Sequence, residues 1–336
     1  VINAANTVAS LGAGASRVFT GTNVVDVMTG GNGNDTLTGN AGNDNLTGGD
    51  GADALIGGLG NNTYTYTAAN TADSGETITF NQTTGATETM AVSAGAANVT
   101  VDVSLVNGGA LLTGLDAITM TSTDDITMVG SQITGLTFSA TGVNGGGDET
   151  MTVNGATGTV NDTINLANLT LTDVALVVAA GAGDDTITAS AGGGSITGGT
   201  GADTITLGGG ADVVVIGNTD SGATVALADS ITGFNSAADG LSMGLAGNAT
   251  ANNAAENYGE AAGAVANFAA ALTAANNTLA VLNAKTGNTA AQLYNFQFDA
   301  TNGYLFEDTD GDGDADQVVV LVGVNNTGIA VTDITA

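Results

Sequence analysis

A nine-residue period at residues 30–65 restricts the possible folds more than any other feature of the sequence. The frame GGxGxDxUx, in which U is a large aliphatic residue, fits four consecutive units: GGNGNDTLT (30–38), GNAGNDNLT (39–47), GGDGADALI (48–56) and GGLGNNTYT (57–65). Because Gly and Asn tolerate positive φ, the first six positions predict a turn. The last three positions predict a very short strand whose middle side chain faces inward.

Successive units are expected to stack, because one unit cannot bury its apolar side chain alone. The units GAGASRVFT (12–20) and GTNVVDVMT (21–29) keep the phase upstream in weakened form. Stacking predicts a thin interior built from Phe19, Met28, Leu37, Leu46, Leu55 and Tyr64. It also places Asp35, Asp44 and Asp53 at regular intervals along the turns.

The same phase returns in a second block. Its units are AGAGDDTIT (180–188), ASAGGGSIT (189–197), GGTGADTIT (198–206) and LGGGADVVV (207–215). Asp185, Asp203 and Asp212 hold the Asp position, whereas Gly194 leaves one unit without a carboxylate. Fewer cations are therefore expected here than in an unbroken array.

The charge balance requires cations from outside the chain. The 336 residues include 33 acidic residues and two basic ones, Arg17 and Lys285, for a formal net charge of -31. Two carboxylates about 4 Å apart repel by roughly 4 kcal/mol at an effective dielectric constant near 20. Oxygen-rich sites of this kind suit a hard ion such as calcium. Nucleic acid and bare anionic membranes are excluded as partners, because almost nothing here neutralises phosphate.

The nonapeptide resembles the repeats-in-toxin (RTX) proteins, in which the chain winds into a β-roll and binds several Ca²⁺ ions. In that family the Asp carboxylate and backbone carbonyls of successive turns hold the ion. The resemblance implies calcium ligands at Asp26, Gly30, Asn32, Asp35, Gly39, Asp44, Gly48, Asp50, Asp53, Asn62, Asp185, Gly198, Asp203 and Asp212. Two positions of the first block depart from Asp: Asn62 still offers a neutral oxygen, and Arg17 is expected to close the end of the stack with its own charge.

Between the two blocks, at about 67–178, the frame dissolves but short strands remain. Segments such as ETMAV (88–92), DDITM (124–128) and ETMTV (149–153) place an acid just before a Thr-flanked aliphatic residue. They predict a β-solenoid or a β-sandwich of short strands. For Glu76, Glu88 and Glu149, a solvated charge at a strand edge and a calcium ligand are equally good interpretations.

A helix is expected at about 256–284, as a cap of the solenoid. Its apolar face contains Val265, Phe268, Leu272, Leu279 and Leu282.

Five aspartates alternate near the C-terminus in YLFEDTDGDGDADQVVV (304–320). The start matches the D-x-D-x-D-G opening of an EF-hand loop, but Val319 stands where that loop needs Glu. The segment resembles the calcium-binding β-turn of RTX exoproteins, which implies ligands at Asp308, Asp310, Asp312, Asp314 and Asp316. The alternative is a solvated run of acids. The last residues, NTGIAVTDITA, resemble the ends of proteins exported by type I secretion.

These observations predict an all-β fold: calcium-bound parallel β-roll or β-solenoid blocks, an irregular β-rich middle and a C-terminal β cap that carries one helix. The expected parts are an N-terminal RTX β-roll (1–66), the irregular region (67–178), a second RTX β-roll (179–217) and a capping and secretion region (218–336). No apolar run approaches the ~20 residues of a membrane span. The opening VINAAN carries no secretory signal, so we expect a processed start or a longer N-terminal part.

Several classes of enzyme are excluded by composition. The chain has no His and no Cys, so Ser-His triads, Cys nucleophiles and the usual zinc sites are absent. Carboxylate-only glycoside hydrolysis stays open on residue types, but the chain has no Trp for a sugar platform. We therefore expect a protein that is not an enzyme.

The acidic, Cys-free composition with abundant Ala, Gly, Thr and Asn resembles the RTX-type surface-layer (S-layer) proteins of aquatic Gram-negative bacteria. That resemblance implies an extracellular structural subunit on the bacterial cell surface. Its expected partner is itself, in a two-dimensional lattice or a filament. Cell-surface polysaccharide, bound through a region that precedes this sequence, is a further candidate partner. The alternatives are a fragment of an RTX adhesin or extracellular filament, and the noncatalytic tail of a secreted RTX exoenzyme.

Overall fold

The computed structural model describes residues 14–66, 77–80, 85–93, 100–104, 106–121, 124–142, 149–244, 257–261, 263–284, 292–324 and 329–335. It divides into two compact units, Val1–Asn154 with Asn168–Val177, and Gly155–Ala167 with Val178–Ala336. Glu76 lies outside the described residues. The expected division into four parts stays a prediction.

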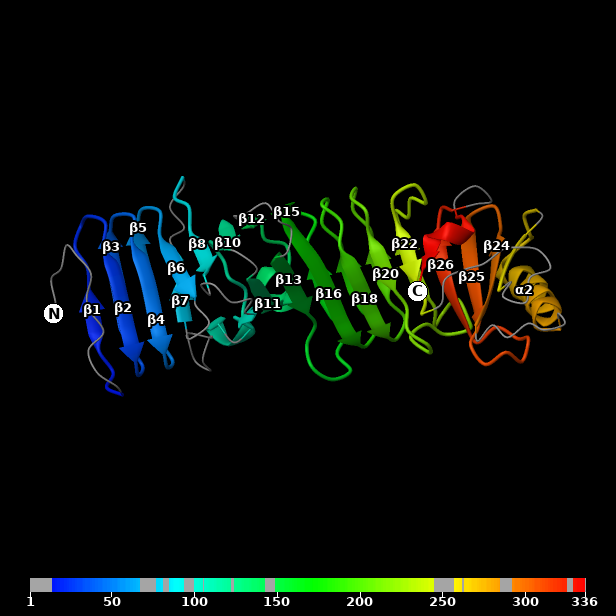
Figure 1. Cartoon of the computed structure of the whole chain (residues 1–336), viewed down its shortest axis with the longest axis horizontal. Coiled ribbons are helices and arrows are strands. Elements are labelled where there is room, and N and C mark those ends of the chain that lie inside the picture. The colour runs from blue at the N-terminus through cyan, green and yellow to red at the C-terminus, as the bar shows by residue number, and fades with distance from the viewer. Residues whose placement is uncertain are drawn as a thin grey trace. The chain divides into compact units, whose positions relative to one another are not determined.

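The first unit is a coil of short parallel strands, several of which are labelled in Figure 1. One sheet has the order β1-β3-β5-β7: β1 (Val18–Thr20), β3 (Thr36–Ala41), β5 (Ala54–Leu59) and β7 (Thr77–Thr79). A second has the order β15-β12-β10-β8-β6-β4-β2: β15 (Leu169–Thr172), β12 (Phe138–Gly142), β10 (Ala117–Met120), β8 (Thr89–Val92), β6 (Thr63–Tyr66), β4 (Asn45–Asp50) and β2 (Val27–Asn32). The remaining elements are β9 (Thr100–Asp102), β11 (Asp125–Val129), β13 (Glu149–Asn154), the 3₁₀ helix η1 (Val106–Gly109) and the one-turn helix α1 (Gly130–Ile133).

Alternate nonapeptides lie in opposite sheets of this coil. Leu37 of β3 pairs with Leu55 of β5, whereas Leu46 of β4 lies opposite Tyr64 of β6. Two units of nine residues therefore make one turn of the coil. The side chains predicted to fill the interior are all buried: Phe19, Met28, Leu37, Leu46, Leu55 and Tyr64. Each turn thus adds two apolar side chains to one narrow core.

The second unit continues this pattern and then changes it. One sheet contains, as successive neighbours, β27 (Ile334–Thr335), β22 (Gly240–Ser242), β20 (Val213–Val215), β18 (Ser195–Thr200) and β16 (Val174–Ala182). The other has the order β14 (Thr163–Asn165), β17 (Thr186–Thr188), β19 (Thr204–Thr206), β21 (Asp229–Thr232), β26 (Gln317–Val322), β25 (Asn302–Asp308), β24 (Leu293–Phe298) and β23 (Tyr258–Glu260). Strands β24, β25 and β26 pair antiparallel, unlike the coil. A 3₁₀ helix, η2 (Val331–Asp333), precedes β27.

The prediction of a parallel β-roll with one C-terminal helix is confirmed, but the helix bounds were wrong at the start. Helix α2 runs from Phe268 to Asn283, not from 256, and its N-cap Asn267 accepts a hydrogen bond from the Ala270 N–H at 3.0 Å. Residues Tyr258–Glu260 form β23 instead, parallel to β24. The helix begins directly after Asn267 because the Asn267 side chain satisfies a free N–H of the first turn. In the core that α2 forms with the antiparallel strands, Ala271 and Ala275 pack near Phe306.

Candidate metal sites

The Asp side chains of the nonapeptides form columns inside the turns. Asp26, Asp35, Asp44 and Asp53 are each only 1% exposed. One carboxylate oxygen of Asp35, Asp44 and Asp53 accepts the backbone N–H of the residue 18 positions earlier, whereas Asp26 Oδ2 accepts the N–H of Thr22. The Asp26 N–H donates to Asp44 Oδ1 at 2.8 Å, and the Asp35 N–H donates to Asp53 Oδ1 at 2.7 Å. Asp35 and Asp53 thus share one column, and Asp26 and Asp44 share the other.

The second oxygen of several of these carboxylates has no hydrogen-bond partner among the described residues. This holds for Asp35 Oδ2, Asp44 Oδ2, Asp185 Oδ2, Asp203 Oδ2 and both oxygens of Asp212. A buried carboxylate that lacks compensation is strongly destabilising, so buried acids are normally paired or bound to a metal. The chain has two basic residues for 33 acids and cannot supply the partners itself.

The first glycine of three units in the first block leaves a space beside that second oxygen. A methyl group built on Gly30 would come within 3.0 Å of both Asp35 Oδ2 and the Gly48 carbonyl oxygen. At Gly39 the corresponding atoms are Asp44 Oδ2 and the Gly57 carbonyl oxygen, and at Gly48 the Asp53 side chain lies equally close. A carboxylate and a carbonyl oxygen therefore converge beside Gly30 and beside Gly39, which is the hard-oxygen donor set that calcium prefers.

Positive φ angles explain the glycines at the second and fourth positions of each unit. In the unit that starts at Gly30, φ is +109° at Gly31 and +111° at Gly33. Asn40 occupies the second position of the next unit with φ +77°, and Asn is the residue that best tolerates this region after Gly. The turn chemistry of the sequence thus follows from the backbone that brings the oxygens together.

The second block repeats this arrangement and extends it beyond the nonapeptide frame. The Asp185 N–H donates to Asp203 Oδ1 at 2.8 Å, and the space at Gly198 faces Asp203 Oδ2. Three further acids belong to these columns. Asp162 donates its N–H to Asp185, Asp229 accepts the N–H of Asp203, and Asp239 accepts that of Asp212. Sequence reasoning missed all three, although NDTINL (161–166) and ADSIT (228–232) carry the same Asp-x-aliphatic signal.

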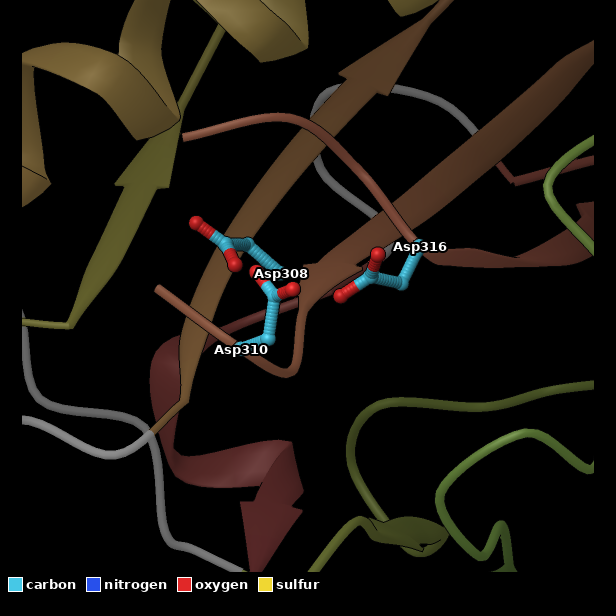
Figure 2. A group of neighbouring side chains, drawn as sticks. All are labelled: Asp308, Asp310 and Asp316. Carbon is cyan, nitrogen blue, oxygen red and sulfur yellow. The ribbon is translucent and has the colours of Figure 1, made fainter. Parts of the chain in front are cut away.

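A separate acidic group lies on the turn between β25 and β26. Carboxylate oxygens of Asp308, Asp310 and Asp316 all lie within 4.8 Å of one another (Figure 2). Asp308 is buried and accepts the N–H groups of Gly311 and Gly313, which shapes the turn. The structure does not bring Asp312 and Asp314 into this group, and both are exposed.

Helix α2 supports this turn from one side. Asn276 accepts the Ala315 N–H at 3.1 Å, and Asn283 Nδ2 donates to the Gly311 carbonyl. The turn is flanked by strands rather than helices, as the sequence predicted. Its three clustered carboxylates can bind a cation, and calcium at this turn stays a prediction.

Comparison with known families identifies the type of repeat to which the nonapeptides belong. The model of the RTX calcium-binding nonapeptide repeat matches residues 29–64, 177–193 and 190–218, with four copies. The chain carries RTX calcium-binding nonapeptide repeats. RTX repeats bind calcium, and the proteins that carry them are typically secreted. No curated protein matches the chain.

Among solved structures, the extracellular lipase LipA from Serratia marcescens aligns with 13% identity and a TM-score of 0.20, over 96% of this chain and 40% of the lipase chain. The chain thus spans less than half the length of that protein, and the low TM-score carries no argument about fold or activity. In the described part of the chain, no helix has the length and apolarity needed to cross a bilayer.

In the first block, both residues that depart from Asp lie at ends of the described RTX columns. The Arg17 N–H donates to Asp35 Oδ1 at 2.7 Å, and Arg17 Nη1 donates to the Gly30 carbonyl oxygen at 3.2 Å. The predicted closure of the stack by a charge is consistent with these contacts. Asn62 Oδ1 accepts the Asp44 N–H, while its Nδ2 donates to Glu88 Oε1 at 3.1 Å. An amide here therefore links the RTX column to the acids of the middle region.

Asn32 and Asp50 occupy the third position of their units and point away from the buried columns. They lie opposite each other in β2 and β4, and both side chains are exposed. Only their backbone is close to the turns, since the Gly33 N–H donates to the Asp50 carbonyl oxygen at 2.7 Å. The structure therefore does not bring these two side chains together with Asp35, Asp44 or Asp53.

Burial raises the pKa values of several column carboxylates. It raises the pKa of Asp229 to about 7 and those of Asp203 and Asp212 to about 6. Loss of hydration is the largest cause, and neighbouring acids (Asp203 beside Asp229, Asp185 beside Asp203, Asp239 beside Asp212) add to it. At Asp229 and Asp203, a hydrogen bond from the backbone N–H of Asp203 and of Asp185, respectively, opposes the increase in pKa. Without a cation, these three carboxyl groups therefore bind protons more tightly in the folded second unit than in the unfolded chain.

These shifts predict opposite pH dependences with and without calcium. An acid whose pKa is higher in the folded state binds more protons there, so acidification from about pH 8 to about pH 5 favours folding. In EGTA, the folded fraction measured by circular dichroism is expected to rise over this range. In calcium, protons compete for the same oxygens, so calcium affinity is expected to fall over the same range. If the folded fraction in EGTA instead decreased on acidification, the raised pKa values of these carboxyl groups in the folded state would be contradicted.

Proposed function

We propose that this RTX protein is a structural subunit of a bacterial surface layer, that calcium drives its folding and lateral assembly, and that it is not an enzyme. The observation that carries the proposal is the set of buried Asp columns, in which the unpartnered second oxygens of Asp35 and Asp44 each lie beside a backbone carbonyl oxygen. Metal binding at such sites contributes directly to the free energy of folding. A bound calcium ion would supply the positive charge that the chain lacks.

Self-association by way of cations is supported by the overall charge. At a net charge of -31, two copies repel each other unless counterions intervene. Exposed carboxylates such as Asp50 and Asp173 are available to divalent ions on the surface. Calcium between copies would therefore convert repulsion into attraction, which fits a lattice that forms outside the cell.

The structural role is further supported by what the sequence lacks. Without His and Cys, the general bases and nucleophiles of most hydrolases are missing. The buried acids are arranged in repeating columns, as stacked metal sites require, rather than as one pair across a cleft. The proposal of a non-enzyme follows from this chemistry.

Electron microscopy with and without calcium tests the proposal. Purified protein in millimolar calcium is expected to form two-dimensional sheets, and excess EGTA is expected to dissolve them, whereas excess magnesium in place of calcium is expected to leave the protein dispersed. Growth along a single axis would favour the adhesin or filament alternative instead. Folded single particles in calcium would contradict the layer proposal, and sheets that persist after metal analysis shows complete chelation would contradict the role of calcium.

A further inference from the structure

One buried acid outside the RTX frame has the environment of a metal ligand. Glu149 is the first residue of β13, in the irregular middle region, and its side chain is 0% exposed. Neither Oε1 nor Oε2 has a hydrogen-bond partner among the described residues. The interpretation of Glu149 as a solvated charge at a strand edge is therefore wrong, and its charge needs another form of compensation.

The surroundings of Glu149 reproduce those of the RTX sites. A methyl group built on Gly142, the last residue of β12, would come 2.8 Å from Glu149 Oε2 and still closer to the Asp173 carbonyl oxygen. Gly30 has the same two neighbours, a carboxylate oxygen of its own coil and a carbonyl oxygen of the next. The segment from Gly142 to Glu149 is longer than that from Gly30 to Asp35, and the Glu side chain is longer than that of Asp. Even so, a carboxylate and a carbonyl oxygen converge here as they do in the nonapeptides.

A second buried carboxylate lies on the neighbouring strand. Ile126 of β11 pairs with Met151 of β13, so Asp124 and Glu149, two residues earlier in each segment, are adjacent. Asp124 is also 0% exposed, and its Oδ2 accepts a hydrogen bond from Thr121 Oγ1 at 3.2 Å. Because neighbouring strands are about 4.8 Å apart, two acids share one buried location. A divalent cation matches their combined charge.

Glu88 shows what a buried glutamate looks like when protein groups compensate it. Its side chain is also 0% exposed, but Asn62 Nδ2 donates to Oε1 at 3.1 Å and the Tyr64 hydroxyl donates to Oε2 at 2.8 Å. The two glutamates have the same chemistry and burial and differ in their donors. Glu88 is therefore a matched control for Glu149.

We propose that Glu149, the Asp173 carbonyl oxygen and Asp124 form a calcium site outside the RTX repeats. The donors are two carboxylates and a carbonyl, all oxygen, as calcium requires. The ion joins β11 and β13 to the end of β15, where the coil no longer has nonapeptides to hold its turns. Calcium thus stabilises the middle of the first unit as well as its repeats.

The test counts calcium ions on full-length variants. Glu149→Gln keeps the shape of the side chain and removes its charge, and Gly142→Ala fills the space beside Oε2 while leaving the acid in place. Native mass spectrometry in calcium is expected to show one ion fewer for each variant than for the wild type. Glu88→Gln is expected to retain the wild-type number.

A second readout separates ion loss from a general loss of stability. The increase of the melting temperature with the logarithm of calcium concentration reports how many ions bind on folding. This slope is expected to decrease for Glu149→Gln and Gly142→Ala and to stay unchanged for Glu88→Gln, even if that variant melts at a lower temperature. A wild-type ion count and slope in Glu149→Gln would overturn the proposal. So would an equal loss in Glu88→Gln, or, should Glu149→Gln fail to fold, a wild-type count in Gly142→Ala.

Discussion

Removal of calcium at neutral pH is expected to unfold the RTX blocks. Adjacent carboxylates in one column are separated by about one strand spacing, and each such pair repels by roughly 4 kcal/mol at an effective dielectric constant near 20. A few uncompensated pairs therefore approach the total stability of a domain, about 5–15 kcal/mol. In excess EGTA, the far-ultraviolet circular dichroism of the strands is expected to collapse, and millimolar calcium is expected to restore it.

Magnesium is the control for this experiment. It demands near-octahedral geometry and loses its water reluctantly, so equal magnesium is expected to restore far less of the β signal than calcium does. Metal analysis must accompany the spectra, because traces of calcium would stabilise the fold. A chain that keeps its full β signal and shows no bound metal would refute calcium-driven folding.

The repeats could be predicted from sequence because one period encodes both the turn and the core. Each Asp-x-Leu step places a carboxylate in the turn and an apolar side chain in the interior, and both expectations hold for Asp44 with Leu46 and for Asp53 with Leu55. The nine-residue period does not predict which units lie in the same sheet. The pairing of residues 18 apart appears only in the structure, in hydrogen bonds such as that from Asp26 to Asp44.

The middle region was harder to predict from sequence because the number of residues in each turn of the coil varies there. Hydrogen bonds between successive column positions span 26 residues from Asn62 to Glu88, 28 from Glu88 to Asp116 and 23 from Asp162 to Asp185. No fixed period can detect such a coil, although the acid-x-aliphatic signal still marks each strand. Sequence alone also left the roles of Glu88 and Glu149 open, because the groups around them (the donors Asn62 and Tyr64 at Glu88, the Asp173 carbonyl oxygen at Glu149) come from distant parts of the chain.

The sequence analysis predicted a C-terminal β cap but not its antiparallel strands, for a different reason. Strands β24, β25 and β26 are buried along nearly their whole length on both faces, so they lack the alternation that reveals a half-exposed strand. Helix α2 was found through its apolar face, but the predicted start included Gly259 and Gly263, which disfavour helix. The structure uses that segment for β23 and the approach to Asn267.

Gly198→Ala is expected to block one RTX calcium site while leaving every carboxylate in place. The added methyl group would collide with Asp203 Oδ2, in the space where the oxygens converge. Overpacking of this kind costs about 1–3 kcal/mol. Loss of one ion removes about 2.7 kcal/mol more when calcium is at 100 times its dissociation constant. The variant is therefore expected to melt well below the wild type in calcium and to bind at least one ion fewer by native mass spectrometry.

Gly209→Ala is the matched control, because a methyl group at Gly209 has nothing within 4 Å and its φ lies outside the left-handed region. Gly209 lies in the same block as Gly198, and replacing either glycine with Ala restricts the backbone of the unfolded chain to the same extent. The Gly209→Ala variant is therefore expected to keep the wild-type melting temperature and ion count. The stability difference between the two variants is expected to shrink as calcium is lowered, since the wild type and Gly209→Ala lose their ions and only the steric term remains. If Gly198→Ala bound as many ions as Gly209→Ala, the space beside the first glycine would not be the calcium position.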